Sequence, residues 1–239
     1  MMQEDPRFVH GGNVYEPTAG GEPWLDFSAN INPLGLSPRV QEAILAHIED
    51  TIHYPDPKMR ELRAALSAYY DRAPSDFILG NGAAELFYLY AFVMRPKRVL
   101  LPVPAFSEYE RAAHAAGAAV SYSPLEERAG FEPDLIFLAE EAQRVQADCI
   151  VLGNPNNPTG THLRRDELVT LSERLTALGC GLMLDESFLD FRRDEVRYTL
   201  RREAAHLPHL LLVRSLTKFF ALPGLRLGFA IAQPSLVRL

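Results

Sequence analysis

Short apolar runs alternate along the chain with longer stretches in which apolar residues recur at helical spacing. Seven runs predict strands: Phe77–Leu79, Val99–Leu101, Ala119–Tyr122, Cys149–Leu152, Leu182–Leu184, Leu210–Val213 and Leu227–Ile231. Helical patterns lie at Ala83–Met94, Phe106–Ala116, Arg165–Leu178 and Tyr198–Ala205. Strands that alternate with helices predict an α/β domain of three layers, with a mostly parallel sheet between the helices.

Two further helices are predicted before the first strand, and a partial one at the end of the chain. Ser37 is a suitable N-cap and Pro38 suits the first helical position. Asp56 and Pro57 are expected to begin a second helix in the same way. Residues 234–239 are typical of the first turns of a helix that does not continue. We therefore expect a fragment of a longer protein; the resemblance described below implies that the missing part is a C-terminal small domain.

Residues 1–36 show little periodicity and contain much Gly, Pro and Asn. Trp24, Leu25, Phe27 and Ile31 are apolar enough that they should be buried, which favours an ordered arm over a disordered tail. The patterns thus divide the chain into an N-terminal arm, residues 1–36, and a large domain, residues 37–239.

Composition narrows the class of protein. The formal charge of −7 argues against a nucleic-acid surface, which requires a basic face. Cys149 and Cys180 form no CxxC motif, and we expect a reduced, cytoplasmic protein without a metal site. The longest apolar run, Leu86 to Met94, is too short to cross a membrane, and the polar start is unlike a secretory signal.

The strongest chemical signal is the segment Ser215–Gly228, which follows an apolar run. It places Lys218 in an apolar setting of Phe219, Phe220 and Leu222. Burial would lower the pKa of the lysine amine and make it a usable nucleophile. A solvated surface lysine is the alternative interpretation of Lys218 taken alone.

Three other polar segments also follow predicted strands. They are Gly80–Glu85, Asn154–Gly160 and Leu184–Phe188. Each alone is explained by a tight turn or a helix cap. Together they are expected to meet, because ligands of open α/β sheets bind at the carboxyl ends of the strands.

With these segments, the sequence resembles the fold-type I enzymes that use pyridoxal 5'-phosphate (PLP), the aspartate aminotransferase superfamily. Asn-Pro-Asn-Asn-Pro-Thr-Gly, residues 154–160, and Ser-Leu-Thr-Lys-(x)7-Arg, residues 215–226, carry that resemblance. Within the superfamily the chain is similar to histidinol-phosphate aminotransferases, and more so to L-threonine-O-3-phosphate decarboxylases of cobalamin synthesis. His10–Asn13, Asp26–Gly35 and Pro102–Glu110 carry the decarboxylase resemblance.

The resemblance implies a role for four residues around the cofactor ring. Lys218 would bind the PLP aldehyde covalently and later move protons at the substrate carbon. Asp185 would keep the pyridine nitrogen protonated. Asn157 would donate to the ring's 3-oxygen, and Phe106 would stack on the ring face.

The resemblance also implies how the phosphate is held. The helix start at Gly82, Ala83 and Ala84 would offer N–H groups and a favourable dipole. The further donors would be the hydroxyls of Ser215 and Thr217 and the guanidinium of Arg226. Tyr54 would reach the phosphate of the neighbouring subunit, which implies a homodimer; a buried tyrosine at a helix entry is the alternative.

His10, Gly11, Asn30 and Asn157 match substrate-contacting positions of the decarboxylases, although a structural or solvated His10 is an equal alternative. Phe188 stands where many aminotransferases carry a tyrosine that donates to the 3-oxygen, so a standard transaminase is less expected. The arginines that bind substrate in the family lie in the region expected to be missing.

Four functions remain open from the sequence. The leading hypothesis is a lyase that decarboxylates L-threonine O-3-phosphate to (R)-1-amino-2-propanol O-2-phosphate. A histidinol-phosphate-type aminotransferase is the second, and a non-catalytic PLP-binding fragment is the third. A nucleotide-binding domain is the fourth, but Gly80-x-Gly82 lacks the third glycine of a dinucleotide loop.

Overall fold

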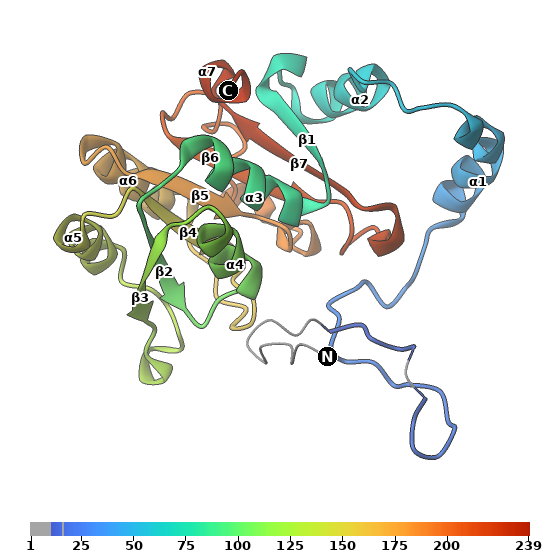
Figure 1. Ribbon diagram of the computed structural model, residues 1–239, viewed down its shortest axis with the longest axis horizontal. Coiled ribbons are helices and arrows are strands. Elements are labelled where there is room, and N and C mark those ends of the chain that lie inside the picture. The colour runs from blue at the N-terminus through green and yellow to red at the C-terminus, as the bar shows by residue number, and fades with distance from the viewer. Residues whose placement is uncertain (1–10, 16) are drawn as a thin grey trace.

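The computed structural model describes residues 11–15 and 17–239. Its centre is a seven-stranded sheet in the order β1-β7-β6-β5-β4-β2-β3 (Figure 1). The strands are β1 (Phe77–Asn81), β2 (Arg98–Val103), β3 (Ala119–Pro124), β4 (Cys149–Gly153), β5 (Gly181–Asp185), β6 (Leu210–Ser215) and β7 (Leu227–Ala232). Strands β2 to β6 pair in parallel, whereas β7 is antiparallel to both β6 and β1. All seven strand predictions are confirmed, as is the mostly parallel sheet.

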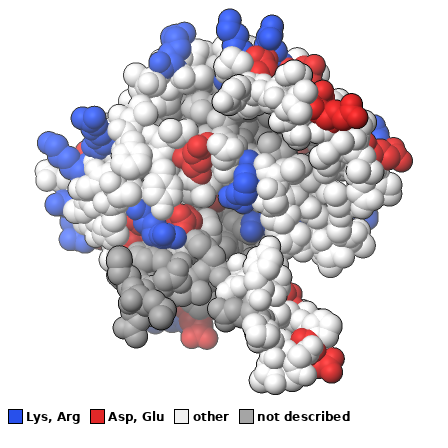
Figure 2. Space-filling model, turned by 45° about the vertical axis from the view of Figure 1, so that its right-hand side comes forward, with Lys and Arg blue, Asp and Glu red and all other residues white. Residues whose placement is uncertain are grey.

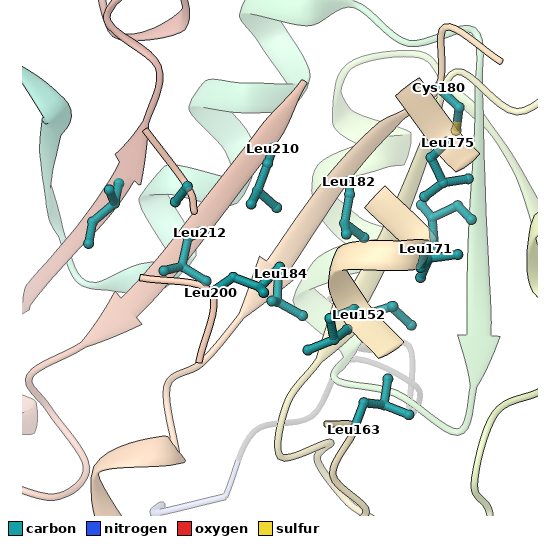
Figure 3. Packing of buried hydrophobic residues seen from close by; sticks show 14 of the residues in the cluster. Leu152, Leu163, Leu171, Leu175, Cys180, Leu182, Leu184, Leu200, Leu210 and Leu212 are labelled. Carbon is teal, nitrogen blue, oxygen red and sulfur yellow. The ribbon is translucent and has the colours of Figure 1, made fainter. Parts of the chain in front are cut away.

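Helices cover both faces of the sheet. Side chains of α3 (Ala83–Met94) and α4 (Ser107–Ala115) pack on one face, and those of α5 (Leu135–Val145) and α6 (Arg165–Ala177) pack on the other. Leu182 and Leu212 belong to the core cluster drawn in Figure 3, while Met183 and Val213 belong to the cluster on the opposite face. Because neighbouring strand residues point to opposite faces, these central strands must be apolar throughout.

The remaining helices lie near the two ends of the described chain. They are α1 (Pro38–Ala46), α2 (Arg60–Tyr70) and α7 (Pro234–Val237). Ser37 caps α1 as predicted, and its side chain accepts from the N–H of Val40. No helix among the described residues is long and apolar enough to span a bilayer.

Two helix predictions need correction, and one helix was not predicted. The second helix begins at Arg60 and not at Asp56, because the Asp56 carboxylate accepts from the N–H groups of Lys58 and Arg60 and forms a turn before the helix. Residues 198–205 form turns, since the N–H of Leu200 is bonded to the Glu186 carboxylate. Helix α5, which was not predicted from the apolar pattern, follows the N-cap Asp134, whose carboxylate accepts from two N–H groups.

The described part of the N-terminal arm, residues 11–15 and 17–36, extends away from the sheet (Figure 1). The prediction that its apolar side chains are buried is wrong for this chain: Leu25 is 82% and Phe27 86% exposed, and Trp24 is half exposed. Ile31 is partly buried. The reason is geometric, because this part of the arm runs outside the domain and none of the described layers covers those side chains.

Charged side chains are distributed over the surface without a continuous basic region on the face drawn in Figure 2. Lys and Arg groups there alternate with Asp and Glu groups.

Candidate active site

The sheet register brings the four polar segments to one edge. Asp185 is the last residue of β5 and pairs with Gly153, the last residue of β4, and with Val213 of β6. The backbone N–H of Asn154 donates to the carbonyl of Asp185 at 2.8 Å. Three of the segments therefore meet where parallel strands end, as ligand sites of this architecture do.

The fourth segment joins them through the antiparallel strand β7. Gly228 of β7 pairs with Ser215 on one side and with Gly80 on the other. A Cβ on Gly228 would lie 2.6 Å from the backbone nitrogen of Ala83, so the start of α3 packs directly on this strand. This close approach requires glycine and places the first turn of α3 beside the end of β6.

The Asp185 carboxylate is buried and fully hydrogen-bonded. Its Oδ1 accepts from the N–H of Ser187 at 2.9 Å and from the Ser187 hydroxyl at 2.5 Å. Its Oδ2 accepts from the Tyr109 hydroxyl at 2.7 Å. Burial raises the pKa of Asp185, and these hydrogen bonds and the charge of Lys218 oppose the increase. All of the hydrogen-bonding partners are neutral groups.

Tyr109 is a site residue that was not predicted from the sequence. It is buried in α4, and its ring contacts Phe106 edge to face with 5.6 Å between the ring centroids. Phe106 is partly buried immediately before α4. Tyr109 thus connects the residue predicted to stack on the cofactor with the carboxylate predicted to face its nitrogen.

Lys218 lies in the loop between β6 and β7 with its side chain partly buried. Burial lowers the pKa of the amine, as does the charge of Arg226, while Asp185 opposes the shift. In the part of the chain that the structure describes, no hydrogen bond or ion pair holds the Nζ atom. A partly dehydrated amine of lowered pKa is a better nucleophile than a surface lysine.

The residues predicted to hold the cofactor phosphate form a set that we call the anion cradle. They are Gly82, Ala83, Ala84, Ser215, Thr217 and Arg226. Gly82 has a φ of +84° at the N-cap of α3, and a Cβ there would lie 2.8 Å from Nη2 of Arg226. Ser215 Oγ lies 2.7 Å from Thr217 Oγ1, and both residues are buried. No side chain caps α3, so its first N–H groups stay available to an anion.

The turn that carries Asn157 is fixed by its neighbours. Asn154 is fully buried; its Oδ1 accepts from the N–H of Leu163, and its Nδ2 donates to the carbonyls of Leu163 and Tyr198. Asn157 itself is partly buried. The predicted cofactor-binding asparagine therefore lies on a hydrogen-bonded turn that follows β4 and contacts the end of β5.

Three other predicted residues, Tyr54, Gly11 and Asn30, lie in the segments that precede α2. Tyr54 is 99% exposed between α1 and α2, which excludes the alternative of a buried helix-entry tyrosine within this chain. Asn30 is exposed in the arm, and a Cβ on Gly11 would overlap the carbonyl of Ser28, so these two arm segments lie against each other. His10 lies outside the described residues.

A model of one protein family matches residues 22–239: aminotransferase class I and II. The chain belongs to this family. Among its relatives is a threonine-phosphate decarboxylase of Salmonella typhimurium, 36% identical over 93% of this chain and 61% of that protein. A histidinol-phosphate aminotransferase of Chlorobaculum tepidum is 32% identical over 94% of this chain and 63% of its own length.

Solved structures agree with this membership. The histidinol-phosphate aminotransferase from Clostridium acetobutylicum superposes with a TM-score of 0.79 at 29% identity, covering 90% of this chain and 62% of that one. The L-threonine-O-3-phosphate decarboxylase from Porphyromonas gingivalis gives 0.75 at 26% identity, covering 89% and 61%. The chain thus spans about three fifths of the length of the relatives it matches.

Family membership confirms the predicted fold class and the predicted cofactor, PLP. The residues present fit that group: an uncapped helix start and two hydroxyls suit a phosphate, a partly buried amine suits an aldehyde, and a buried carboxylate suits a pyridinium. When bound, PLP supplies a ring that withdraws electrons from a bond at the substrate carbon.

Proposed function

We propose that the protein containing this chain decarboxylates L-threonine O-3-phosphate to (R)-1-amino-2-propanol O-2-phosphate for cobalamin biosynthesis. The observation that carries the choice is Phe188, three residues after Asp185, where many aminotransferases place a tyrosine hydroxyl. The decarboxylase-like segments Asp26–Gly35 and Pro102–Glu110 support the same choice.

In this proposal each group around the cofactor has a distinct role. Lys218 binds the aldehyde and afterwards moves a proton at the substrate carbon. Asp185 keeps a proton on the pyridine nitrogen, because its hydrogen bonds from neutral groups leave its charge available. Asn157 donates to the 3-oxygen, and Phe106 packs on the ring face.

The anion cradle would bind the cofactor phosphate through the backbone N–H groups at the start of α3 and the guanidinium of Arg226, which lies next to Gly82. His10, Gly11, Asn30 and Asn157 contact the substrate. Tyr54 reaches the phosphate bound by the other subunit of a homodimer, which its exposure in this chain permits.

The second candidate is a histidinol-phosphate aminotransferase. Relatives with that name are 31 to 36% identical over 87 to 94% of the chain, which overlaps the 36% of the Salmonella decarboxylase. Identity alone therefore leaves both reactions open, and the substrate has to be measured.

The first test is covalent trapping. Borohydride reduction of the PLP-treated protein should leave a pyridoxyl group on Lys218, found by mass spectrometry of the digested chain. Lys218→Ala should abolish the adduct, whereas Lys58→Ala, at an exposed lysine, should leave it unchanged. An adduct on another lysine would refute the cofactor assignment.

The second test separates the reactions, in the longest natural protein that contains this chain. Release of CO2 from L-threonine O-3-phosphate without a 2-oxo acid supports the lyase. Activity with histidinol phosphate that strictly requires 2-oxoglutarate overturns it in favour of the aminotransferase. PLP binding with no spectral change on addition of either substrate indicates a non-catalytic protein.

The homodimer is tested by dilution. If Tyr54 holds the phosphate across an interface, PLP affinity falls when the protein is diluted until its dimers dissociate. Tyr54→Phe should bind PLP more weakly and lose most of this dependence on concentration. An affinity that is independent of concentration, with dissociation verified by sedimentation, contradicts the assignment.

A further inference from the structure

Asn32, a residue of the arm, is bonded directly to the loop that carries Lys218. Its backbone N–H donates to the carbonyl oxygen of Lys218 at 3.0 Å. Its Nδ2 donates to the carbonyl oxygen of Phe219 at 2.8 Å, in a partly buried contact. Asn32 and Phe219 are 187 positions apart in the sequence, so this contact depends on the tertiary fold.

The lysine loop has other restraints, but they lie elsewhere. The N–H of Leu216 donates to Leu227, at the start of β7, and the N–H of Leu222 donates to Thr217. Ala221 also donates to the Lys218 carbonyl at 3.3 Å. These bonds set the curvature of the loop from within, whereas Asn32 holds its peptides at 218 and 219 from outside.

We propose that Asn32 is a positioning residue that orients the peptide of Lys218, and thereby fixes the amine relative to Asp185 and the anion cradle. This inference rests on the proposed function of Lys218. It also gives the arm a second role, because Asn32 lies two positions after Asn30, a predicted substrate contact, and is bonded to the loop of the catalytic amine.

The polar atoms of Asn32 form two separate sets of contacts, and this makes the inference testable. Its Oδ1 accepts from the N–H of Leu34 at 3.1 Å, and its backbone carbonyl accepts from Gly35, so the oxygens shape the turn of the arm. Its two nitrogens hold the lysine loop. Asn32→Asp keeps the acceptor for Leu34 and removes the donor to Phe219. Asn32→Ala removes the same donor without adding a charge.

The first measurement uses the protein without cofactor. Competitive labelling of lysine amines with acetic anhydride, read by mass spectrometry across pH, reports the reactivity of the Lys218 amine. Loss of the bond to Phe219 should loosen the loop and hydrate the amine, so that its pKa rises toward the ordinary lysine value. The free energy of one hydrogen bond corresponds to about a 2- to 10-fold change in an equilibrium constant. We therefore expect labelling of Lys218 near neutral pH to slow by about that factor in both variants.

The second measurement uses the PLP-loaded protein. The pH midpoint of its visible absorbance should move upward in both Asn32 variants. The matched control is Thr18→Ala, which removes a hydrogen bond of the same kind inside the arm, from the Thr18 hydroxyl to the Glu22 carbonyl at 2.7 Å. It should leave Lys218 labelling and the absorbance midpoint at their wild-type values.

Two results would overturn the inference. One is wild-type Lys218 labelling and an unchanged midpoint in both Asn32 variants. The other is an equal shift in Thr18→Ala, which would reduce Asn32 to a general support of the arm. Absence of a pyridoxyl adduct on Lys218 in the wild-type protein refutes instead the proposed function, so the two failures are distinguishable.

Discussion

Asp185 and Glu186 are adjacent in the chain and both are buried, yet they lie on opposite sides of the sheet. Asp185 lies on the side of α4, where Ser187 and Tyr109 donate to it. Glu186 lies 3.1 Å from the Nε atom of Arg214 and accepts from Thr199 and Leu200. The Asp185 carboxylate is thus bonded by neutral groups, whereas the Glu186 carboxylate is paired with an internal cation. We therefore predict that Asp185 interacts with the cofactor and that Glu186 supports the fold.

Arg214 is the centre of the region behind the site, with no exposed surface. Its guanidinium also contacts Asp190 at 2.9 Å and Glu195 at 3.1 Å. Arg214 directly precedes Ser215, so this cluster joins the ends of β5 and β6 on the side of the sheet opposite to Asp185. We call this side the back of the site, and the side with Asp185 and the anion cradle the front. The comparison predicts that mutations at the back lower the stability of the fold, whereas mutations at the front lower the rate of the reaction.

The largest expected effect is on folding. Arg214→Met should lower the free energy of unfolding by about 3–5 kcal/mol, because it leaves buried carboxylates without a cation. Urea unfolding followed by circular dichroism measures this loss. Arg201→Met is the control, since Arg201 bonds the same Glu195 from a partly exposed position and should cost about 1 kcal/mol or less. Equal losses in the two variants would contradict a structural role specific to Arg214.

In front of the sheet, Asp185→Asn should spare the fold and impair the reaction. Asn matches the shape of Asp but cannot hold a proton on the pyridine nitrogen, so kcat should fall about 10²- to 10³-fold. Steady-state kinetics and urea unfolding of the same samples measure the two quantities. A loss of several kcal/mol in unfolding free energy with near-normal kcat would reverse the assignment of the two faces.

The pH dependence of stability sharpens the contrast. Burial raises the pKa of Glu186 to about 7 despite Arg214, so the folded protein binds this proton more tightly than the unfolded chain does. The stability that this group contributes is therefore present below its unfolded pKa, near 4.5, and is lost as the pH rises through about 7. Glu186→Gln should flatten the fall in unfolding free energy across that window. A variant as steep as the wild type would show that Glu186 is ionised throughout.

The smallest expected effect concerns Tyr109. Tyr109→Phe deletes the hydroxyl that donates to Asp185, so the charged form of Asp185 loses about 1.5 kcal/mol of stabilisation. The pKa of Asp185 should rise further, so the acidic limb of the rate profile should move to higher pH. Tyr88→Phe is the matched control, because its hydroxyl donates to the Glu108 carboxylate between α3 and α4, away from the strand ends. A similar shift in both variants would exclude a specific effect on Asp185.

Much of the fold could be predicted because its signals are local. The central strands are buried on both faces, so each is a continuous apolar run, and α3 was predicted with the bounds that the structure has. The start of α2 was predicted too early, since Asp56 and Pro57 suit a turn as well as a helix start. The segments shared with the family located Asp185, Lys218 and the anion cradle, and these residues lie near one another as expected. Their roles in the reaction stay predictions.

The missed residues act over long separations. Tyr109 meets Asp185 across 76 positions, and Asn32 meets the lysine loop across 187. Arg214 lies in an apolar run and gives no local sign of the carboxylates that surround it. Such contacts arise only when strands and arm are placed in space, and no spacing in the sequence encodes them.

The antiparallel direction of β7 has a consequence for how this protein can be altered. Residues 216–226 form the loop between β6 and β7, and both ends of this loop are fixed because the two strands pair with each other. Lys218 and Arg226 both lie in this loop. Single residues of this loop can be substituted while the paired strands keep its two ends in place. Adding or deleting even one residue changes the distance between the Lys218 amine and the Arg226 guanidinium. Changes in loop length should therefore be far less tolerated here than in the outer connections of the domain.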